Sequence, residues 1–539
     1  MSGTLLTPKK PGSLYAFIQA RTSSTRFPGK VLKELPEGSG NVLLDHIHFR
    51  LSKVLPQSRI VYVIPEGDFE LESFLASKNR RVFSGPLDDV RARYILAASK
   101  FGAEAILRLT GDNPFYDVKH LGLLLLSFLE GTSQLSYFKG LPLGTGGEVF
   151  RTEALLWEPK GGLEERHREH VSLHIKEHPE KFRITSIPSL IAEKDSNRIP
   201  RFRLTVDTPE DFRTMQAILE EPAKSIPNTD TKIPAFGLDD LLKWEADHPK
   251  LFEGNASVPQ IKFPLPTSNR KSKGNIALLI APAKEFGSGH EARSHILYSL
   301  LPDRDWEPAL VSEFPKDGEY QGLIIDYRDI SIPIEYKKTK LLLLDHFGKE
   351  RKIHPHFDLL PHPLNRSSFD WSNILLPPSI TSYSLNPATE EVKQYEFFCY
   401  AGAIEKRQSD DLDRLLLRQS PSGKILRVGG SPPSTESGRI DHVDRLSTND
   451  YLTALRGSKR FFGYFGQSLF EALYLGIPSA TFGISPIHET LSSMLQEDAG
   501  IPYYKNADSI EFSTGTRIPG PKGYHNILEY IDLMFYHKS

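Results

Sequence analysis

Short apolar runs alternate with amphipathic stretches along the first part of the chain. Residues 14–20, 60–65 and 105–109 are apolar over the length of a buried strand, whereas residues 41–54 and 88–102 repeat apolar positions at helical spacing. This alternation is typical of a parallel sheet flanked by helices, in which ligands bind at the carboxyl ends of the strands. We therefore predict an α/β fold and expect its binding site among the residues that follow these strands.

The pattern restarts after a segment of different composition. Residues 254–273 contain three prolines, several small polar residues and a cationic end, which predicts a linker. Residues 275–301 then read as a strand, a glycine-rich turn and a helix, and further strands follow. We expect a flexible tail over residues 1–13, a first domain over 14–253, the linker over 254–273, and a second α/β domain over 274–539 with room for two lobes.

Length, charge and cysteine content narrow the kind of protein. A chain of 539 residues is too long to fold around a single core. Its content of 25% charged and 39% hydrophobic residues is ordinary for a globular enzyme. The formal net charge of −2 gives no general attraction to nucleic acid or to an anionic membrane, so phosphate binding must be local. Cys399 is the only cysteine, which excludes an intrachain disulfide and a cysteine-based zinc site. Because no signal-peptide core or membrane-length apolar run occurs, we expect a cytoplasmic protein.

Cations crowd the segment that follows the first predicted strand. Arg21, Arg26 and Lys30 lie within ten residues, hydroxyl side chains including Ser23 lie between them, and a proline and a glycine precede the lysine. A turn that exposes backbone N–H groups beside two guanidinium groups and an ammonium group would hold a polyphosphate. A solvated basic loop is the alternative that charge spacing alone leaves open.

Two aspartates also follow apolar runs. Asp112 lies in the sequence TGDNP after one predicted strand, and Asp207 lies in VDTPEDF after another. Carboxylates from two strand ends could together hold Mg²⁺, which prefers oxygen ligands and keeps some of its waters. Each aspartate could instead cap a helix, because DTPEDF reads as a helix start with proline in its first turn.

Six ordered segments resemble those of a known family. The segments QARTSSTRFPGKVL, SGPLDDVRARY, RLTGDNP, GGEVF, REHV and RLTVDTPEDF occur in the order found in the spore-coat polysaccharide type of sugar cytidylyltransferase, a relative of the CMP-3-deoxy-manno-octulosonate and CMP-acylneuraminate synthetases. The resemblance covers about residues 14–220. It implies a Rossmann-like, GT-A-like nucleotidyltransferase that uses CTP and Mg²⁺ to activate a sugar acid of the nonulosonic type as its CMP derivative, with release of pyrophosphate.

The resemblance also implies roles for individual residues. A sugar oxygen would attack the α-phosphorus. Such a reaction is catalysed mainly by positioning the substrates and stabilising charge on the phosphate oxygens, and it needs no covalent nucleophile. The residues expected to bind the CTP phosphates are Arg21, Ser23, Arg26 and Lys30, those expected to hold the metal are Asp112 and Asp207, and those expected to act in catalysis are Lys30, Asp112 and Asp207.

Further residues of these segments have both a functional and a structural interpretation. Asp88 and Gly111 match the nucleotide side, although Asp88 and its charged neighbours could simply be solvated helix charges. Glu148 and the pair Glu169–His170 match the sugar side, where His170 could equally be a helix-packing histidine.

The second half contains two turns with small residues ahead of predicted helices. GSGHEAR places Gly289, His290 and Arg293 at a strand-to-helix turn, and GYFGQSLFE places Ser468 and Glu471 at another. A helix N-terminus with small residues can seat a diphosphate, and a glutamate inside the helix can reach a ribose. Two ordinary α/β turns are the structural alternative.

These turns resemble the UDP-sugar hydrolase family of pseudaminic acid biosynthesis, which has a GT-B-like fold. Its Gly-x-Gly-His-x-x-Arg turn corresponds to Gly287, Gly289, His290 and Arg293, and the resemblance implies that His290 assists attack of water on a UDP-sugar. The segment GYFGQSLFE departs from the paired glycines that this family usually shows. A catalytically silent binding or dimerisation module and a glycosyltransferase are therefore alternatives, and a homodimer is a further expectation.

Overall fold

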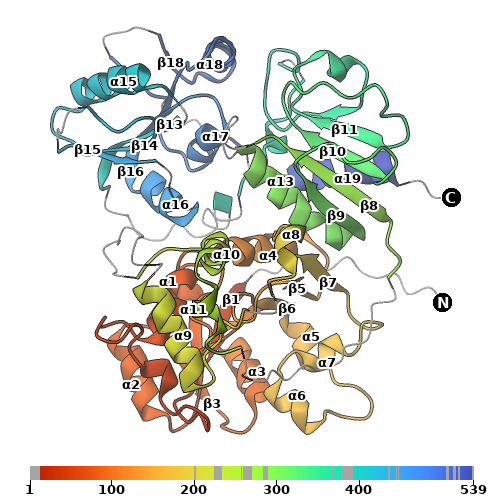
Figure 1. Ribbon diagram of the computed structural model, residues 1–539, viewed down its shortest axis with the longest axis vertical. Coiled ribbons are helices and arrows are strands. Elements are labelled where there is room, and N and C mark those ends of the chain that lie inside the picture. Colours follow the sequence, from red (N-terminus) through yellow and green to blue (C-terminus); the bar gives the residue numbers. More distant parts are fainter. Residues whose placement is uncertain are drawn as a thin grey trace. The chain divides into compact units, whose positions relative to one another are not determined.

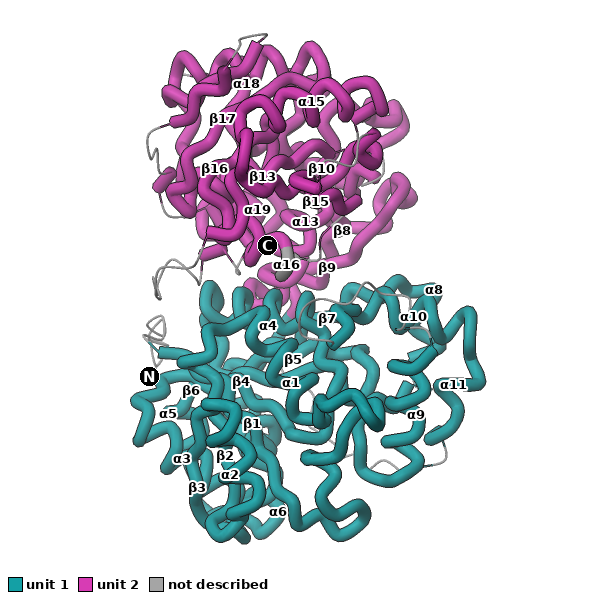
Figure 2. Tube along the Cα trace, turned by 90° about the vertical axis from the view of Figure 1, so that its left-hand side faces the viewer, with its two compact units in different colours: residues 1–271 teal, residues 272–539 magenta. Residues whose placement is uncertain are grey.

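The chain divides into two compact units, residues 1–271 and residues 272–539 (Figure 2). The structure is a computed structural model. It describes residues 13–536 apart from 200–201, 222, 224–232, 257, 259–269, 283–288, 367, 378–379, 382–392, 403, 435–437, 445, 447, 506–508, 514–517 and 520–522. Residues 1–12 of the tail expected over 1–13, most of the expected linker, and Gly287 lie outside the described residues.

Unit 1 is built around a seven-stranded sheet in the order β3-β2-β1-β4-β6-β5-β7 (Figure 1). The first strand lies near the middle and pairs in parallel with β2 and β4, so the segments that follow β1 and β4 begin side by side. The strands are β1 (Leu14–Gln19), β2 (Ile60–Pro65), β3 (Arg81–Gly85), β4 (Ala105–Thr110), β5 (Leu135–Lys139), β6 (Glu148–Arg151) and β7 (Ile184–Pro188).

The sheet is mixed rather than wholly parallel, which corrects the prediction from the apolar pattern. Strand β6 runs antiparallel to both β4 and β5. Only residues 140–147 connect β5 to β6, and a parallel connection needs a crossover of about a dozen residues or more. The antiparallel strand places Glu148 beside Arg108 of β4.

Helices cover the sheet, and three of them begin at the capping aspartates Asp68, Asp89 and Asp117. Phe17 of β1 and Ile106 of β4 pack in one core cluster with Tyr94 of the adjoining helix, so this face of the sheet is buried. The helices of unit 1 are α1 (Leu43–Leu51), α2 (Phe69–Ser77), α3 (Val90–Phe101), α4 (Val118–Glu130), α5 (Thr152–Leu156), α6 (Glu165–Glu169), α7 (Leu173–Lys176), α8 (Glu193–Ser196), α9 (Pro209–Glu220), α10 (Leu238–Asp247) and α11 (Pro249–Glu253).

Unit 2 contains two parallel sheets, as the restart of the α/β pattern predicts. A five-stranded sheet has the order β12-β11-β10-β8-β9, and a six-stranded sheet has the order β15-β14-β13-β16-β17-β18. The strands are β8 (Gly274–Ile280), β9 (Trp306–Val311), β10 (Gly322–Asp326), β11 (Lys340–Leu344), β12 (His356–Phe357), β13 (Tyr395–Gly402), β14 (Ile425–Gly429), β15 (Ile440–Val443), β16 (Ser458–Gly463), β17 (Ser479–Phe482) and β18 (Tyr503–Tyr504).

The last helix of unit 2 returns to the first of its two sheets. Asp532 accepts hydrogen bonds from the Trp306 indole at 2.8 Å and from Lys273 at 2.7 Å, and a side chain at Gly322 would clash with Phe535. The chain therefore closes its five-stranded sheet with a helix from the far end of the sequence. The helices are α13 (Gly289–Leu300), α15 (Lys406–Gln419), α16 (Thr448–Arg456), α17 (Gln467–Tyr474), α18 (Pro486–Ala499) and α19 (Gly523–Phe535).

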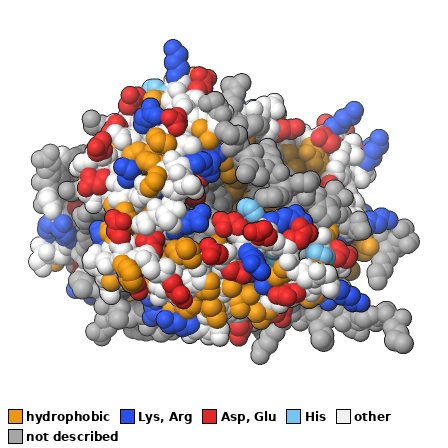
Figure 3. All heavy atoms as spheres, turned by 90° about the horizontal axis from the view of Figure 1, so that it is seen from below, with side chains coloured by type: hydrophobic (Ala, Val, Ile, Leu, Met, Phe, Trp, Pro, Cys, Tyr) orange, Lys and Arg blue, Asp and Glu red, His pale blue; other side chains and the backbone are white. Residues whose placement is uncertain are grey.

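Charged side chains of both signs are interspersed with hydrophobic ones on the face that Figure 3 shows. This mixture agrees with the formal net charge of −2. Within the described residues, no helix is both long and apolar enough to cross a membrane.

Candidate active site

The ends of β1 and β4 are held together by a backbone hydrogen bond. The N–H of Gly111 donates to the carbonyl of Gln19 at 2.7 Å, and a Cβ at position 111 would lie 2.8 Å from the Cβ of Ala20. Only glycine allows this approach. The basic loop that follows β1 and the turn that carries Asp112 consequently start from the same point.

Asp68 fixes the first part of the basic loop. The backbone N–H and the hydroxyl group of Thr22 each donate to the Asp68 carboxylate at 2.8 Å, and the N–H of Gly29 donates to the Thr22 carbonyl at 2.9 Å. Gly29 has a φ of +68°, which favours glycine. The loop exposes Arg21, Ser23 and Arg26 and buries Lys30.

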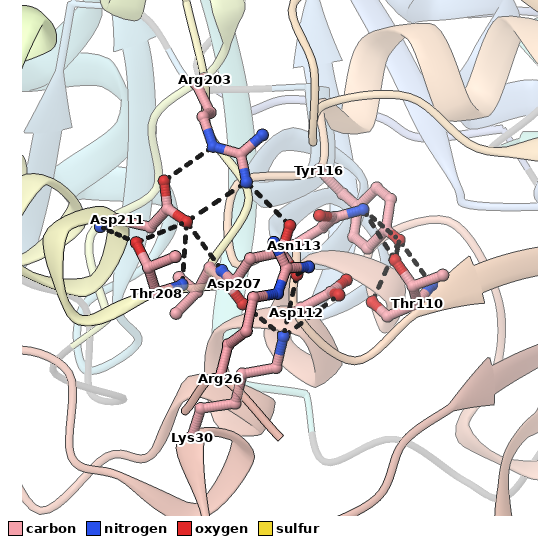
Figure 4. A network of polar contacts seen from close by, with 11 residues as sticks. Arg26, Lys30, Thr110, Asp112, Asn113, Tyr116, Arg203, Asp207, Thr208 and Asp211 are labelled. Carbon is pink, nitrogen blue, oxygen red and sulfur yellow. Dashed lines mark hydrogen bonds and ion pairs between the residues drawn. The ribbon is translucent and has the colours of Figure 1, made fainter. Parts of the chain in front are cut away.

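Lys30 lies between the two predicted metal ligands (Figure 4). Its ammonium nitrogen is 3.4 Å from Asp112 Oδ2 and 3.3 Å from Asp207 Oδ1, and it donates to the carbonyl of Val206 at 2.5 Å. The lysine side chain is 9% exposed, whereas the two carboxylates are 27% and 24% exposed. The buried cation thus offsets the repulsion between two carboxylates whose other sides face solvent.

A second cation, Arg203, contacts the other carboxylate oxygen of Asp207. Arg203 donates to Asp207 Oδ2 at 2.8 Å and to Asp211 Oδ1 at 2.8 Å, and Asp211 Oδ2 accepts the N–H groups of Asp207 and Thr208. Burial would raise the pKa of Asp211, but Arg203 and these N–H donors outweigh it and lower that pKa. Oδ1 of Asp207 is left facing Lys30 and Arg26, which are 3.3 and 3.5 Å away.

Neither predicted metal ligand caps a helix. Asp117 caps α4 by accepting the N–H of His120, and Thr208 caps α9 together with Asp211. The capping alternative is therefore wrong for Asp112 and Asp207. The segment before Asp207 is not a strand of the sheet either, since it forms only a single bridge, from Arg203 to Leu143.

The two carboxylates fit a magnesium ion. Among the described residues, no group of three or more His, Cys, Asp or Glu side chains is placed to hold a metal. Asp112 and Asp207 nevertheless offer oxygen atoms that each lie within 3.4 Å of one ammonium nitrogen. Mg²⁺ commonly binds through one or two carboxylates and takes its other ligands from water and substrate phosphates.

The charged residues near the start of α3 have structural contacts. Asp89 caps the helix by accepting the N–H of Ala92 at 2.7 Å, while Asp88 is exposed. Arg91 donates to the Leu155 carbonyl, and Arg93 donates to the carbonyls of residues 86 and 87. The two arginines are 7% and 3% exposed, so the interpretation as solvated helix charges is wrong for them.

Glu148 is buried and contacts three polar side chains. Arg108 is 3.0 Å from one carboxylate oxygen, the Ser172 hydroxyl donates to that oxygen, and Lys176 contacts the other. Burial would raise the pKa of Glu148, but Lys176 and Arg108 lower it to about 2. His170 ends α6, and burial and Arg108 lower its pKa.

In unit 2, His290 and Arg293 meet an aspartate at the end of β10. His290 Nδ1 lies 2.7 Å from Asp326 Oδ1, Arg293 Nε donates to Asp326 Oδ2 at 2.7 Å, and a second Arg293 nitrogen reaches Asp345. Burial would raise the pKa of Asp326, but Arg293 and His290 hold it well below its usual range. A terminal nitrogen of Arg293 also lies 3.0 Å from His290 Nδ1, so this ring nitrogen faces both the aspartate and the arginine.

The two predicted turns of unit 2 lie against each other. A Cβ at Gly289, where α13 begins, would be 3.5 Å from the Cβ of Gln467, where α17 begins. Ser468 is partly exposed in the first turn of α17, and Glu471 one turn later is buried, which raises its pKa to about 7. The fold therefore brings Gly289 and the start of α17 together.

Sequence reasoning missed several members of both sites. Asp326 and Asp345 each directly follow an apolar run, which is the signal that drew attention to Asp112. That signal could have found them. Arg203 and the Val206 carbonyl left no comparable local signal, because their roles depend on how residues 202–207 fold back against the Asp112 turn.

Unit 1 is similar to known proteins. The family model described as Cytidylyltransferase matches residues 15–226. The spore coat polysaccharide biosynthesis protein SpsF of Bacillus subtilis (strain 168) is 34% identical over 38% of this chain and 85% of its own length. An uncharacterized protein of Methanocaldococcus jannaschii is 30% identical over 37% of this chain and 80% of its own length.

Solved structures also match part of the chain. The structure of a cytidylyltransferase from Leptospira borgpetersenii serovar Hardjo-bovis (strain JB197) is 25% identical, covers 47% of this chain and 99% of its own, and has a TM-score of 0.38. Because SpsF shares more than 30% identity over most of its own length, the chain belongs, through its first unit, to the cytidylyltransferase family.

Proposed function

We propose that unit 1 transfers CMP from CTP to a sugar acid of the nonulosonic type and releases pyrophosphate. The observation that carries this proposal is the Lys30 ammonium group, which lies between the Asp112 and Asp207 carboxylates in a chain of the cytidylyltransferase family. The name of SpsF refers to spore coat polysaccharide biosynthesis, so the proposal places the reaction in surface glycan synthesis.

Each side chain of the site has a role in the proposed transfer. The exposed loop residues Arg21, Ser23 and Arg26 would bind the phosphates of CTP through charge-assisted and hydroxyl hydrogen bonds. Asp112 and Asp207 would hold Mg²⁺, which when bound supplies positive charge to the phosphate oxygens. Lys30 would keep the two carboxylates close together and stabilise charge that develops as pyrophosphate leaves.

A pyrophosphate-release assay tests this function. Wild-type protein would be supplied with each of the four nucleoside triphosphates and a panel of 2-keto-3-deoxy sugar acids, with Asp112→Asn as the inactive control. We expect release with CTP and one of the acids only. Release with another triphosphate would contradict the base assignment, and no release with any of the acids would contradict the substrate class.

For unit 2 we propose hydrolysis of a UDP-sugar, supported by the contact between His290 and Asp326. The imidazole would position or deprotonate water, and the helix starts at Gly289 and Ser468 would face the diphosphate, while Glu471 would reach the ribose. Arg293 contacts Asp326 and Asp345, so in this proposal it would hold the two aspartates at the edge of the site.

Product analysis with UDP-diacetamido-trideoxyhexose distinguishes the proposed hydrolase from its alternatives. Free sugar and UDP would support hydrolysis, transfer of the sugar to an acceptor would identify a glycosyltransferase, and no UDP binding would identify a silent module. A cytoplasmic location and a homodimer belong to the same proposal, and sedimentation velocity of the purified chain tests the dimer.

A further inference from the structure

Unit 1 continues beyond the residues that match the cytidylyltransferase family. The match ends at residue 226, whereas the described residues 233–256, which contain α10 and α11, pack as part of the same unit. We call residues 233–256 the extension. Phe236, Leu241 and Phe252 of the extension are each at most 4% exposed, so it belongs to the core of the unit.

The start of the extension is fastened to the turn that carries Asp112. The buried Arg50 guanidinium donates to the Phe236 carbonyl at 2.7 Å and to the Pro114 carbonyl at 3.0 Å. Asp117 accepts the N–H of Leu238 at 2.8 Å. One buried cation and one buried carboxylate therefore connect the extension to the residues directly after Asp112.

The end of the extension is fastened to the turn that carries Asp207. Asn255 is fully buried, and its amide nitrogen donates to Asp211 Oδ1 and to the Arg203 carbonyl, both at 2.8 Å. Arg203 and Asp211 are the residues that hold the side chain and the backbone N–H of Asp207. Asn255, which the sequence assigned to the linker, thus lies inside unit 1.

We propose that the extension is a brace that sets the spacing of the two metal-binding carboxylates, with Asn255 as its positioning residue. The proposal rests on the metal role of Asp112 and Asp207 stated above. Asn255 touches neither carboxylate directly, and acts by fixing the Arg203–Asp211 pair. Arg203 of this pair donates a hydrogen bond to Asp207 Oδ2, which leaves Asp207 Oδ1 facing Lys30.

The arrangement has a physical consequence for metal binding. A magnesium site demands nearly ideal octahedral geometry, so a carboxylate that can rotate or shift binds the ion less well. Asp211 is 0% exposed. It accepts three hydrogen bonds from Asp207 and Thr208 and also forms an ion pair with Arg203. Loss of the Asn255 donor would leave one Asp211 oxygen with one fewer partner and loosen the turn.

The test uses the full chain with Asn255→Ala, and Glu253→Ala as the matched control, because Glu253 is exposed two residues away in the same segment. Mn²⁺ binding is measured by electron paramagnetic resonance with and without CTP. Amide hydrogen exchange over residues 203–212 is measured without metal. We expect roughly tenfold weaker Mn²⁺ binding and faster exchange in Asn255→Ala alone, since a buried hydrogen bond to a charged group is worth about one decade.

The outcomes separate this proposal from the proposed function. Unchanged Mn²⁺ affinity in a folded Asn255→Ala protein overturns the brace, even if urea unfolding shows lower stability. If wild-type protein binds no Mn²⁺, the metal assignment fails. The brace is still tested by amide exchange without metal, because exchange at residues 207–208 that is the same in Asn255→Ala and in wild type overturns it. If Asn255→Ala does not fold, Arg203→Lys replaces it in the test. This variant keeps the positive charge but loses the simultaneous hydrogen bonds to Asp207 and Asp211, and we expect the same weakening of Mn²⁺ binding.

Discussion

The backbone N–H of Val206 donates to the carbonyl of Asp112 at 2.8 Å, so the two acidic turns of unit 1 are hydrogen-bonded to each other. This contact joins residues that are far apart in the sequence and brings their carboxylates to the same ammonium group of Lys30. Because the backbone rather than the side chains makes the contact, substitution of either aspartate leaves the turns in place.

We expect Asp112→Asn and Asp207→Asn each to lower CTP turnover by roughly 10²-fold or more while the protein stays folded. Each change removes a negative oxygen ligand and with it several kcal/mol of transition-state stabilisation. Steady-state rates at limiting and saturating Mg²⁺ check this. Near wild-type rates for both variants at limiting Mg²⁺ would contradict the metal assignment.

Arg21→Ala and Arg26→Ala should each raise the apparent KM for CTP by about tenfold or lower kcat. Both side chains are exposed on the loop after β1, and charge-assisted phosphate contacts are worth about 1.5–3 kcal/mol. Calorimetric titration with CTP checks the affinity, with the exposed cation Lys181→Ala as control. CTP affinity and turnover unchanged in both variants would identify the loop as merely solvated.

The residues with local signals could be predicted from the sequence, whereas those defined by long-range packing could not. Lys30 lies in the cation-rich loop after β1 and Asp112 lies in the turn after β4, and the structure brings them together. The pairing of β6 with β4 and the burial of Asn255 depend on partners at least 40 residues away. No window of the sequence contains both partners, so propensity and spacing alone could not reveal them.

Gly144→Ala should destabilise unit 1 by roughly 2–4 kcal/mol. Gly144 has a φ of +93°, and a Cβ there would lie 2.2 Å from the carbonyl oxygen of Leu204, in the segment that leads to Asp207. Gly162 is the matched control, because its φ is +79° but no atom lies within 4 Å of the added Cβ. We expect Gly162→Ala to cost about 1 kcal/mol. Equal urea-unfolding midpoints for the two variants would contradict this packing.

Glu471 gives unit 2 a stability that falls as pH rises. Burial raises its folded pKa to about 7 from a usual value of 4.5, so the folded state holds a proton that the unfolded state has lost. The stabilisation is complete below pH 4.5 and disappears as pH rises through 7. Glu471→Gln should therefore gain stability relative to wild type above pH 7, on the order of 3 kcal/mol. Urea unfolding at pH 5 and 8 checks this, with exposed Glu313→Gln as control.

Asp326→Asn tests whether the histidine of unit 2 is positioned for catalysis. The carboxylate lies 2.7 Å from His290 Nδ1 and accepts two Arg293 hydrogen bonds, whereas an amide can present its NH₂ group to the ring and change its tautomer or its orientation. We expect UDP release from UDP-diacetamido-trideoxyhexose to fall by roughly 10²-fold or more, as is usual when a catalytic base is lost. The exposed Asp329→Asn, three residues along the chain, should retain activity.

Circular dichroism and urea unfolding of the Asp326→Asn protein distinguish a change at the His290 ring from unfolding of unit 2. Arg293 keeps its contact with Asp345 in this variant, so the buried guanidinium retains one charged partner and the unit should remain folded. Full UDP release by a folded Asp326→Asn protein would show that Asp326 does not orient His290. If wild-type protein releases no UDP at all, the same contacts serve only to join β10, β11 and α13, and the hydrolase proposal fails.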